Sequence, residues 1–587
     1  MSVVSERPES RVHRRPLVWQ TRWVLLGVWM LLGLVLRFAN LTHKAVWTDE
    51  FASMVFSLGN SFRTVPLDQV ISFSDLLAPL RPNPANTLHD VAQSLLTESN
   101  HPPLYFFLTH LWLQLFPPTQ AGWVSVWAMR SLPALCGVLT IPAMFGLGWL
   151  AFRSWVVAHL AAALMAVSPF GVYLGQEARH YTLPGLWVIA SLACFVRVVQ
   201  ILQQRRSLPP WLCLIWVGVN ALGIATHYFV AITLMAECFV LGAIALQHWQ
   251  KDGCLKATAW KWVGVAIAGT VVSALGWLPI IQNVQDSALT DWITLPHRTG
   301  WLWIEPLARI LASILTMLYL LPVQAEFEGL MWPSVIGLLM LLGWTMPKLY
   351  QGIRSSLQQP QQQFPLAVLG GFLAGAIALF LGSAYLLDRD LTLAFRYSFV
   401  YYPVVVLLLA AALASVWERR WQPPQSTTWA NYRSALRYSF VAPVLAWSLV
   451  GALVVVTDLG FLKTHQPAQV VRWMHDPFPN TLIATAHHTH GQTGRLMGLA
   501  LEWQRQMPNA PTPQFLLAHQ SRDRPNDILN TLIPALANLP RPFDLWLVNF
   551  KPISEEALEQ TLSQQTCRVD TKPRRAEGYS FRRYRCQ

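Results

Sequence analysis

Two adjacent carboxylates, Asp49 and Glu50, stand in the sequence WTDE shortly after an apolar run that ends at LVLRFANL. A carboxylate held beside a membrane surface can take a proton from a group that attacks a substrate. Asp49 and Glu50 are therefore the first candidate catalytic residues, and the elements around them must explain why acids lie at the end of an apolar segment.

Four more polar clusters stand where an apolar run begins or ends. Arginine suits phosphate because its planar fork donates two parallel hydrogen bonds, and histidines can also hold an anionic group. Tyrosines in and near the clusters could line a cleft. The clusters therefore predict chemistry on a lipid phosphate, whereas the competing interpretation is solvated helix ends that pair with headgroups. They are NHPPLY with His101, GQEARHY (175–181), THYF (226–229) and DRDLTLAFRY (388–397), with Tyr105, Tyr181, Tyr228 and Tyr397 as the tyrosines.

The composition shows what kind of scaffold carries these clusters. Of 587 residues, 53% are apolar and only 12% are charged, against roughly 25% charged in soluble proteins. Apolar stretches of about 20 residues, enough to cross a bilayer, recur along the chain. The sequence therefore predicts a multi-pass membrane protein. The net charge of +13 comes largely from Lys and Arg in loops and calls for no nucleic acid.

The loops rich in Lys and Arg predict how the protein is oriented in the membrane. The Arg-rich amino terminus lacks the features of a secretory signal, so we expect it in the cytoplasm, and the other basic loops with it. This parity allows eleven crossings and leaves two apolar stretches, 103–117 and about 303–322, as helices in the outer leaflet. All five polar clusters then lie on the extracytoplasmic face. The expected crossings are 23–40, 131–152, 155–173, 181–203, 211–226, 228–248, 261–281, 330–347, 365–387, 398–417 and 439–459.

The residues after position 459 change character and contain no stretch long enough to span. We expect residues 1–459 to form the transmembrane domain and residues 460–587 a small extracytoplasmic α/β domain. NTLIATA and FDLWLVNF predict strands, and TGRLMGLALEWQRQM predicts a helix. An oxidising compartment could join Cys567 and Cys586 in a disulfide. HHTH (487–490) has no carboxylate or cysteine at metal spacing and is interpreted as a solvated loop.

The motifs RFANLTHKAVWTDEFAS, HPPLYFFLTHLW, YLGQEARHYTL, THYF and FRYSFVYYPVVVLLLA occur in one order over residues 20–420. In this order they resemble the GT-C glycosyltransferases that use a polyprenyl-phosphate sugar. The branch is glycosyltransferase family 39, with its protein O-mannosyltransferases and aminoarabinose transferases. The aminoarabinose branch has a Glu-Lys pair where this chain has NHPPLY, which leaves open whether that position supplies a cation.

The resemblance implies an inverting transferase, with roles for the cluster residues. Asp49 would be the general base that deprotonates the acceptor. Arg179 and Arg396 would hold the phosphate. His101, and also His180 and His227, would add hydrogen bonds to the same phosphate or to the sugar. Glu50 and Glu177 would orient substrate hydroxyls or hold the arginines, the alternative being structural salt bridges. Together with the tyrosines, the expected substrate-binding set is His101, Glu177, Arg179, Tyr181, His227, Tyr228, Arg396 and Tyr397.

The resemblance leaves other properties open. The expected partners are a polyprenyl-phosphate sugar donor, membrane lipids and an acceptor that is a lipid, a glycan or a protein. Parts of the superfamily use a divalent cation, so metal dependence is open, and no metal ligands are assigned. No Gly-rich phosphate loop is present for a soluble nucleotide donor.

Two other functions compete with transfer. One is a transporter or flippase of lipid-linked saccharides, which would need ionisable groups near the midplane. Glu237 is the one central carboxylate, and we favour a protonated Glu237 bonded to a neighbouring helix. The other is an inactive anchor that displays the C-terminal domain, which would leave the five clusters without a role.

Overall fold

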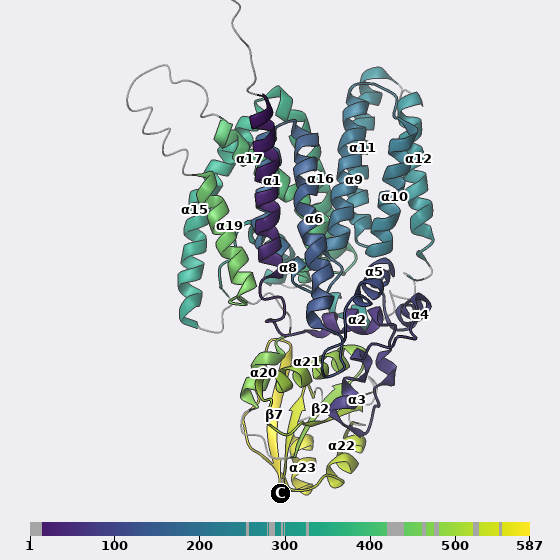
Figure 1. The fold of residues 1–587 in the computed structure, drawn as a ribbon, viewed down its shortest axis with the longest axis vertical. Helices are drawn as coiled ribbons and strands as arrows, with labels where there is room; N and C mark the ends of the chain where they lie inside the picture. Colours follow the sequence, from purple (N-terminus) through teal and green to yellow (C-terminus); the bar gives the residue numbers. More distant parts are fainter. Residues whose placement is uncertain are drawn as a thin grey trace, which may run out of the picture.

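The structure is a computed structural model, and it describes residues 15–253, 257–278, 280, 288–294, 298, 300–323, 328–418, 440–460, 465–474, 480–520, 528–550 and 555–587. A helical bundle forms one end of the molecule, and a smaller domain with a β-sheet forms the other (Figure 1). Short helices of the first long loop lie between them. Cys254 falls outside the described residues.

Long apolar helices make up the bundle, because each buries its backbone hydrogen bonds internally and presents apolar side chains outward. They are α1 (Arg15–Phe38), α6 (Val126–Phe152), α7 (Trp155–Val167), α8 (Pro169–Gly175), α9 (Thr182–Gln203), α10 (Pro210–Thr226), α11 (Val230–Asp252), α12 (Ala257–Leu275), α15 (Glu328–Leu357), α16 (Pro360–Leu386), α17 (Tyr402–Glu418) and α19 (Val441–Val456).

Among the described residues, six of these helices are long and apolar enough to cross a membrane, and seven spans result if the bent pair α7 and α8 counts as one. The remaining bundle helices α10, α12, α17 and α19 are shorter apolar helices. A helix therefore lies at every one of the expected crossings. The prediction of a multi-pass helical membrane protein is confirmed, while length and composition alone support fewer spans than eleven.

A buried arginine stabilises the bend of 55° between α7 and α8. Pro169 interrupts the helix and leaves carbonyls without intrahelical partners. Arg37 of α1 is fully buried and donates to the carbonyl oxygens of Ala166 at 3.1 Å and Met165 at 2.9 Å. A Cβ added at Gly171 would lie 3.1 Å from Nη2 of Arg37, so glycine makes room for the guanidinium here.

The first long loop forms a layer between bundle and sheet. Its elements are α2 (Thr48–Ser57), η1 (Phe62–Thr64), β1 (Val70–Ile71), α3 (Phe73–Leu76), η2 (Ala78–Leu80), α4 (Leu88–Glu98) and α5 (Leu104–Leu113). Between α12 and α17 the chain adds η3 (Ala288–Ile293), η4 (Gly300–Trp303), α14 (Glu305–Leu318), η5 (Leu391–Leu393) and η6 (Phe395–Val400). The helices α5 and α14 occupy the two stretches that were expected to be helical without crossing.

The C-terminal part is a mixed α/β fold, as predicted. Its elements are α20 (Pro467–Trp473), β2 (Thr481–His487), α21 (His490–Gln506), β3 (Gln514–His519), α22 (Ile528–Ala537), β4 (Phe543–Val548), α23 (Glu555–Gln564), β5 (Cys567–Val569), β6 (Arg574–Ala576) and β7 (Tyr579–Cys586).

The sheet includes a strand from the first long loop. The strand order is β1-β3-β2-β4-β7-β5, with β6 on β7, and β2 runs parallel to both β3 and β4. β1 pairs antiparallel with β3, so Val70 lies opposite Leu516 and Ile71 opposite Phe515. This pairing could not be predicted from the sequence, because two residues carry no strand signal of their own.

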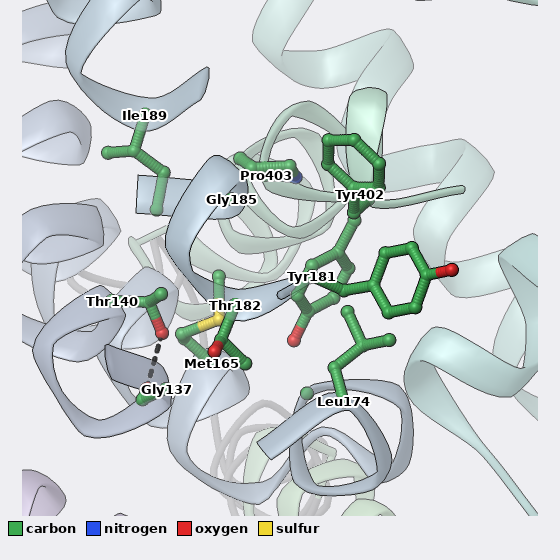
Figure 2. Close-up of a pocket in the computed structure, with 12 residues that line it drawn as sticks. Gly137, Thr140, Met165, Leu174, Tyr181, Thr182, Gly185, Ile189, Tyr402 and Pro403 are labelled. Carbon is green, nitrogen blue, oxygen red and sulfur yellow. Dashed lines mark hydrogen bonds between the residues drawn. The ribbon is translucent and has the colours of Figure 1, made fainter. Parts of the chain in front are cut away.

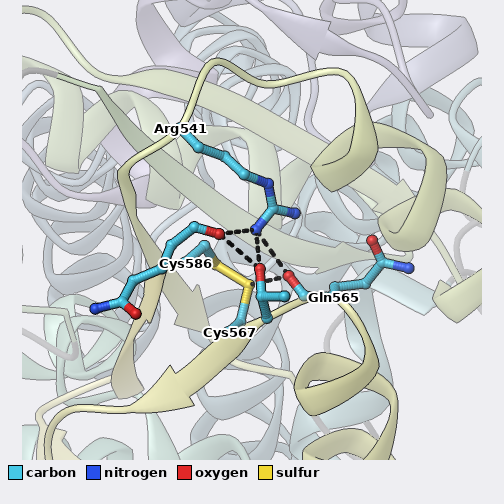
Figure 3. Close-up of a disulfide and its surroundings, with 6 residues drawn as sticks. Arg541, Gln565, Cys567 and Cys586 are labelled. Atoms are coloured by element: carbon cyan, nitrogen blue, oxygen red, sulfur yellow. Dashed lines mark hydrogen bonds between the residues drawn. A yellow bond between two sulfur atoms is a disulfide. The ribbon is translucent and has the colours of Figure 1, made fainter.

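The disulfide between Cys567 and Cys586 forms and ties β5 to the end of β7 (Figure 3). Arg541 lies beside it and donates from Nη1 to the carbonyl oxygens of Gln565 at 2.9 Å and Gln587 at 2.8 Å. The last strand is therefore fixed at its end by a covalent link and by charge-assisted hydrogen bonds.

Candidate active site

Asp49 lies in the first turn of α2, where the helix dipole favours a negative charge. Its Oδ2 is 3.2 Å from Nη2 of Arg396 and 3.8 Å from Nη2 of Arg179. The Asp49 side chain is 29% exposed, whereas both arginines are nearly buried. The three residues come from distant parts of the sequence, and the fold brings them together.

Two opposing effects set the pKa of Asp49. Burial of the carboxyl group raises it, but the charges of Arg396 and Arg179, with smaller contributions from His465 and His490, outweigh burial, so the pKa lies below its ordinary value. Asp49 is therefore ionised and able to accept a proton. The proton affinity of the Asp49 carboxylate stays low as long as both guanidinium groups face it.

Arg179 is anchored from several sides. It lies in the loop between α8 and α9, and its Nη1 donates to the carbonyl oxygen of Asp49 at 2.9 Å and to Oγ of Ser53 at 3.0 Å. Its Nη2 is 3.0 Å from Nε2 of His101. Its guanidinium thus bridges α2 and the end of the first loop.

The contact with Arg179 decides the protonation of His101. A guanidinium only donates hydrogen bonds, so Nε2 of His101 must carry a lone pair and its proton must sit on Nδ1, which faces Oγ of Ser99 at 3.4 Å. Burial first, then the charges of Arg179 and Arg396, lower the pKa of His101 well below its ordinary value. His101 is therefore neutral and orients Arg179 rather than adding a cation.

Arg396 is held by aromatic rings. Its Nε donates to the hydroxyl oxygen of Tyr181 at 2.9 Å. Its Cζ lies 5.1 Å from the ring centre of Trp47, 5.6 Å from that of Trp292 and 5.4 Å from that of Tyr397. Such stacking suits the flat guanidinium and leaves its outer nitrogens to bind an anion.

Asp390 ties the segment that carries Arg396 to its surroundings. Its Oδ2, fully buried, accepts from Nη2 of Arg298 at 2.9 Å and from Nη1 of Arg309, on α14, at 3.2 Å. Its Oδ1 accepts from the amide of Thr392 at 3.0 Å, next to η5. The polar cluster at 388–397 is thus partly structural.

Glu50 is a structural residue in this fold. It is 0% exposed and forms a bidentate pair with Arg130 of α6, with Nε to Oε1 and Nη2 to Oε2 both at 2.7 Å. Oε1 also accepts from the amide of Ala178 at 2.8 Å, and Arg130 donates to the carbonyl oxygens of Leu41 and Lys44. This arrangement fits the alternative of a structural salt bridge, since both oxygens of Glu50 accept from protein donors.

The remaining predicted residues divide into near and distant ones. His180 is fully buried between the rings of His101 and Tyr181, and neither of its nitrogens has a hydrogen-bond partner in the described part of the chain. His227 packs 4.7 Å from His180 between ring centres, and its Nδ1 accepts from the amide of Phe229. Tyr228 instead turns its ring toward Trp277.

Glu177 and Tyr397 also lie at the site. Glu177 is buried, and its charge acts on Arg130. The ring of Tyr397 packs edge-on against Phe229 at 4.6 Å, and the same ring contacts Arg396.

A pocket lies on the bundle side of this cluster, next to Tyr181 (Figure 2). It is walled by residues of α6, α8, α9 and the start of α17, and its lining is almost entirely apolar. Tyr181 therefore separates a polar cluster from an apolar hollow. The lining comprises Gly137, Thr140, Met165, Gly171, Leu174, Tyr181, Thr182, Gly185, Ile189, Phe399, Tyr402 and Pro403.

Glu237 lies away from the site, inside the bundle. Its two oxygens are 3.0 and 3.1 Å from Oγ of Ser191 on α9, which also contacts Oδ1 of Asn220 at 2.9 Å. Ser191 has a single proton to donate, so a protonated Glu237 satisfies both contacts. The predicted bond to a neighbouring helix is present.

The C-terminal domain supplies site residues that the sequence analysis missed. The HHTH segment was wrongly interpreted as a solvated loop, since His490 begins α21 and stacks on Phe62 with ring centres 5.0 Å apart. His465 stacks on Trp47 at 5.9 Å. No group of three His, Cys, Asp or Glu side chains suited to a metal ion occurs within the described residues.

Comparison with known proteins bears on this site. Residues 106–278 match the family described as dolichyl-phosphate-mannose-protein mannosyltransferase, a segment that includes Arg179 and His227. No curated protein matches the chain. The predicted resemblance is confirmed over this segment.

Solved structures that match the chain include ArnT from Cupriavidus metallidurans bound to undecaprenyl phosphate, at 12% identity and a TM-score of 0.45 over 97% of this chain and 98% of that chain. They also include the oligosaccharyltransferase AglB from Archaeoglobus fulgidus in complex with an inhibitory peptide and a dolichol-phosphate, at 13% identity and a TM-score of 0.43 over 85% and 64%. The Pmt1-Pmt2 protein O-mannosyltransferase complex of S. cerevisiae matches at 14% identity and a TM-score of 0.33 over 46% and 34%.

Proposed function

We propose that this chain, whose residues 106–278 match the dolichyl-phosphate-mannose-protein mannosyltransferase family, is a membrane glycosyltransferase. It moves a sugar from a polyprenyl phosphate to an acceptor outside the cytoplasm. The observation that carries this proposal is the cluster of Asp49, Arg179 and Arg396, in which one ionised acid faces two buried guanidinium groups. A base and an anion site lie within one side-chain length of each other.

In the proposed reaction Asp49 takes the proton from the acceptor hydroxyl or amine as that group attacks the anomeric carbon. The bond from that carbon to the phosphate oxygen breaks, and polyprenyl phosphate leaves with the bonding electrons. Attack from the face opposite the phosphate inverts the anomeric carbon. Arg179 and Arg396 stabilise the negative charge that develops on the leaving phosphate, where fixed donors in a nearly dry site act most strongly.

The other residues position these groups. His101 and Ser53 orient Arg179, and Tyr181 orients Arg396. Glu50 and Arg130 fix the start of α2 against α6.

We further propose a GT-C architecture with eleven crossings, counting α7 and α8 as one span and including the shorter helices α10, α12, α17 and α19. Residues 1–459 would form the transmembrane domain and residues 460–587 the extracytoplasmic domain. Basic loops would face the cytoplasm, with the amino terminus inside and the carboxyl terminus outside.

The test is transfer of label from a radiolabelled polyprenyl-phosphate sugar to a membrane extract by the purified full-length protein. Wild type should transfer label, and Asp49→Asn should do so far more slowly. Absence of label transfer by wild type with every polyprenyl-phosphate sugar offered would contradict the proposal.

A further inference from the structure

Helix α21 of the C-terminal domain packs against the start of α2, where Asp49 lies (Figure 1). A Cβ added at Gly494 would come within 3.4 Å of the carbonyl oxygen of Thr48 and 3.3 Å of its Cγ2, and one added at Gly498 within 3.4 Å of the carbonyl oxygen of Val46. The glycines therefore let one backbone approach the other closely.

A second contact, at the sheet, holds the same two parts together. β1 of the first loop extends the sheet through β3, and Oδ1 of Asp68 accepts from the amide of His519 at 2.7 Å. The position of α21 over α2 is thus fixed at two separate places.

Arg495 follows Gly494, the residue of α21 that lies against Thr48 at the start of α2. Its side chain makes no ion pair or hydrogen bond with any residue that the structure describes, and its Nε is buried without a partner. The hydroxyl of Tyr579 donates to the carbonyl oxygen of Arg495 at 3.3 Å and fixes its backbone. The charge of Asp49 acts on Arg495 and also on His490 and His465.

The charged groups thus lie on two sides of Asp49. Arg179 and Arg396 approach it from the bundle and are each held by several partners. Arg495 approaches from the C-terminal domain and has no such partners among the residues that the structure describes. A guanidinium only donates hydrogen bonds, so a ligand that it binds must offer oxygen acceptors.

The donor phosphate and the acceptor must reach the anomeric carbon from opposite faces. If the phosphate lies on the arginines of the bundle, the acceptor enters from the side of α21. We infer that Arg495 is a positioning residue for the acceptor, that its guanidinium binds an acceptor oxygen next to the attacking group, and that the C-terminal domain forms the acceptor half of the active site. This inference rests on the proposed glycosyltransferase function.

The test uses the full-length protein in detergent or nanodiscs and separates donor binding from acceptor use. Binding of polyprenyl phosphate without sugar is measured directly for wild type, Arg495→Ala, Arg495→Lys and Arg396→Gln. Label transfer is then measured against serial dilutions of a membrane extract as the acceptor mixture. Arg568→Ala is the matched control, since Arg568 is an exposed arginine on β5 of the same domain.

We expect Arg495→Ala to bind polyprenyl phosphate like wild type and to need about tenfold more extract for half-maximal transfer. Arg495→Lys should recover part of this loss, because a cation at that position still pairs with an acceptor oxygen. If Arg495→Ala fails to fold, as judged by gel filtration, lipid binding and half-maximal transfer are compared for Arg495→Lys and Arg495→Gln instead.

The inference is contradicted if wild type transfers label and the Arg495 variants reach half-maximal transfer at the same extract dilution as wild type. It also falls if they lose polyprenyl-phosphate binding together with Arg396→Gln, which would place Arg495 on the donor side. A wild type that transfers no label contradicts the glycosyltransferase proposal itself.

Discussion

Oδ2 of Asp49 lies 3.2 Å from Nη2 of Arg396, so the group assigned as base and the group assigned to the donor phosphate neutralise each other in the free protein. A phosphate that binds Arg396 competes with this ion pair. The charge of Arg396 then lowers the pKa of Asp49 less, so Asp49 becomes a better proton acceptor. We therefore expect the base to gain strength when the donor is in place.

Replacing Asp49 by Asn should lower label transfer by about 10²- to 10⁴-fold, the usual cost of losing a general base. Binding of polyprenyl phosphate should stay the same or tighten, because Arg396 is no longer paired. Asp75→Asn, an exposed acid at the start of α3 in the same loop, is the control. A variant that transfers at wild-type speed would remove Asp49 from its role.

Replacing Arg396 by Lys should weaken polyprenyl-phosphate binding by about tenfold or more, although the positive charge is kept. Lysine cannot donate two parallel hydrogen bonds and cannot stack flat on Trp47 and Tyr397. Polyprenyl phosphate is titrated into Arg396→Lys and into the control variant Arg389→Lys. Arg389 lies in the same cluster and contacts Thr294. Equal affinity for both variants would contradict the donor role.

Replacing Glu50 by Gln should destabilise the protein strongly, because Arg130 is then left as a buried cation without its partner. Breaking such a pair costs about 3–5 kcal/mol. The exposed pair of Arg205 and Asp252 is the control, and Arg205→Ala should change stability by about 1 kcal/mol or less. Thermal unfolding in detergent measures both, and an unchanged unfolding temperature for Glu50→Gln would refute the structural role.

Acid should destabilise the C-terminal interface through His490. Burial lowers the pKa of His490 to about 4, although Asp49 raises it in part. The unfolded chain takes up this proton near pH 6.5, so between pH 6.5 and about 4 the unfolded state binds more protons and stability falls as the pH drops.

His490→Phe keeps the ring against Phe62 and should reduce that loss by up to about 1.4 kcal/mol per pH unit. The exposed neighbour His488 provides the control variant His488→Gln. Unfolding curves at about pH 7 and about pH 5 compare the three proteins. A slope for His490→Phe equal to that of wild type would show that this ring does not titrate in the window.

Gly494→Leu should separate α21 from α2, because even a Cβ at this position meets the backbone of Thr48. We expect limited proteolysis to release the C-terminal domain faster, with label transfer reduced. Gly264→Leu on α12, where an added Cβ meets nothing within 4 Å, is the control. Unchanged protease resistance of Gly494→Leu would show that α21 does not depend on this close approach.

Much of the bundle and half of the site could be predicted from the sequence. Apolar length locates each helix, and charge parity places the clusters of Asp49, Arg179 and Arg396 on one face before any contact is known. The partners of each helix could not be predicted, because an apolar run indicates burial without indicating against what. The pairing of Glu50 with Arg130 is an example, since Arg130 lies inside the run at α6 and resembles no site residue.

The contribution of the C-terminal domain to the site could not be predicted from the sequence either. His490 and Arg495 stand in a helix whose polar residues are ordinary for an exposed surface, and only the fold places them over α2. The glycines of α21 were visible in the sequence. Their close approach to Thr48 and Val46 depends on a contact between segments more than four hundred residues apart.

The pairing of β1 with β3 has a consequence for how the protein is made. Asp68 and His519, bonded beside that pairing, are 451 residues apart in the chain, so the ribosome completes the whole bundle before the partner of β1 exists. Until then the edge of β1 stays open beside the unfinished site. A nascent chain released early should therefore remain inactive even when all its helices are inserted, and truncation before β3 should yield a membrane protein without turnover.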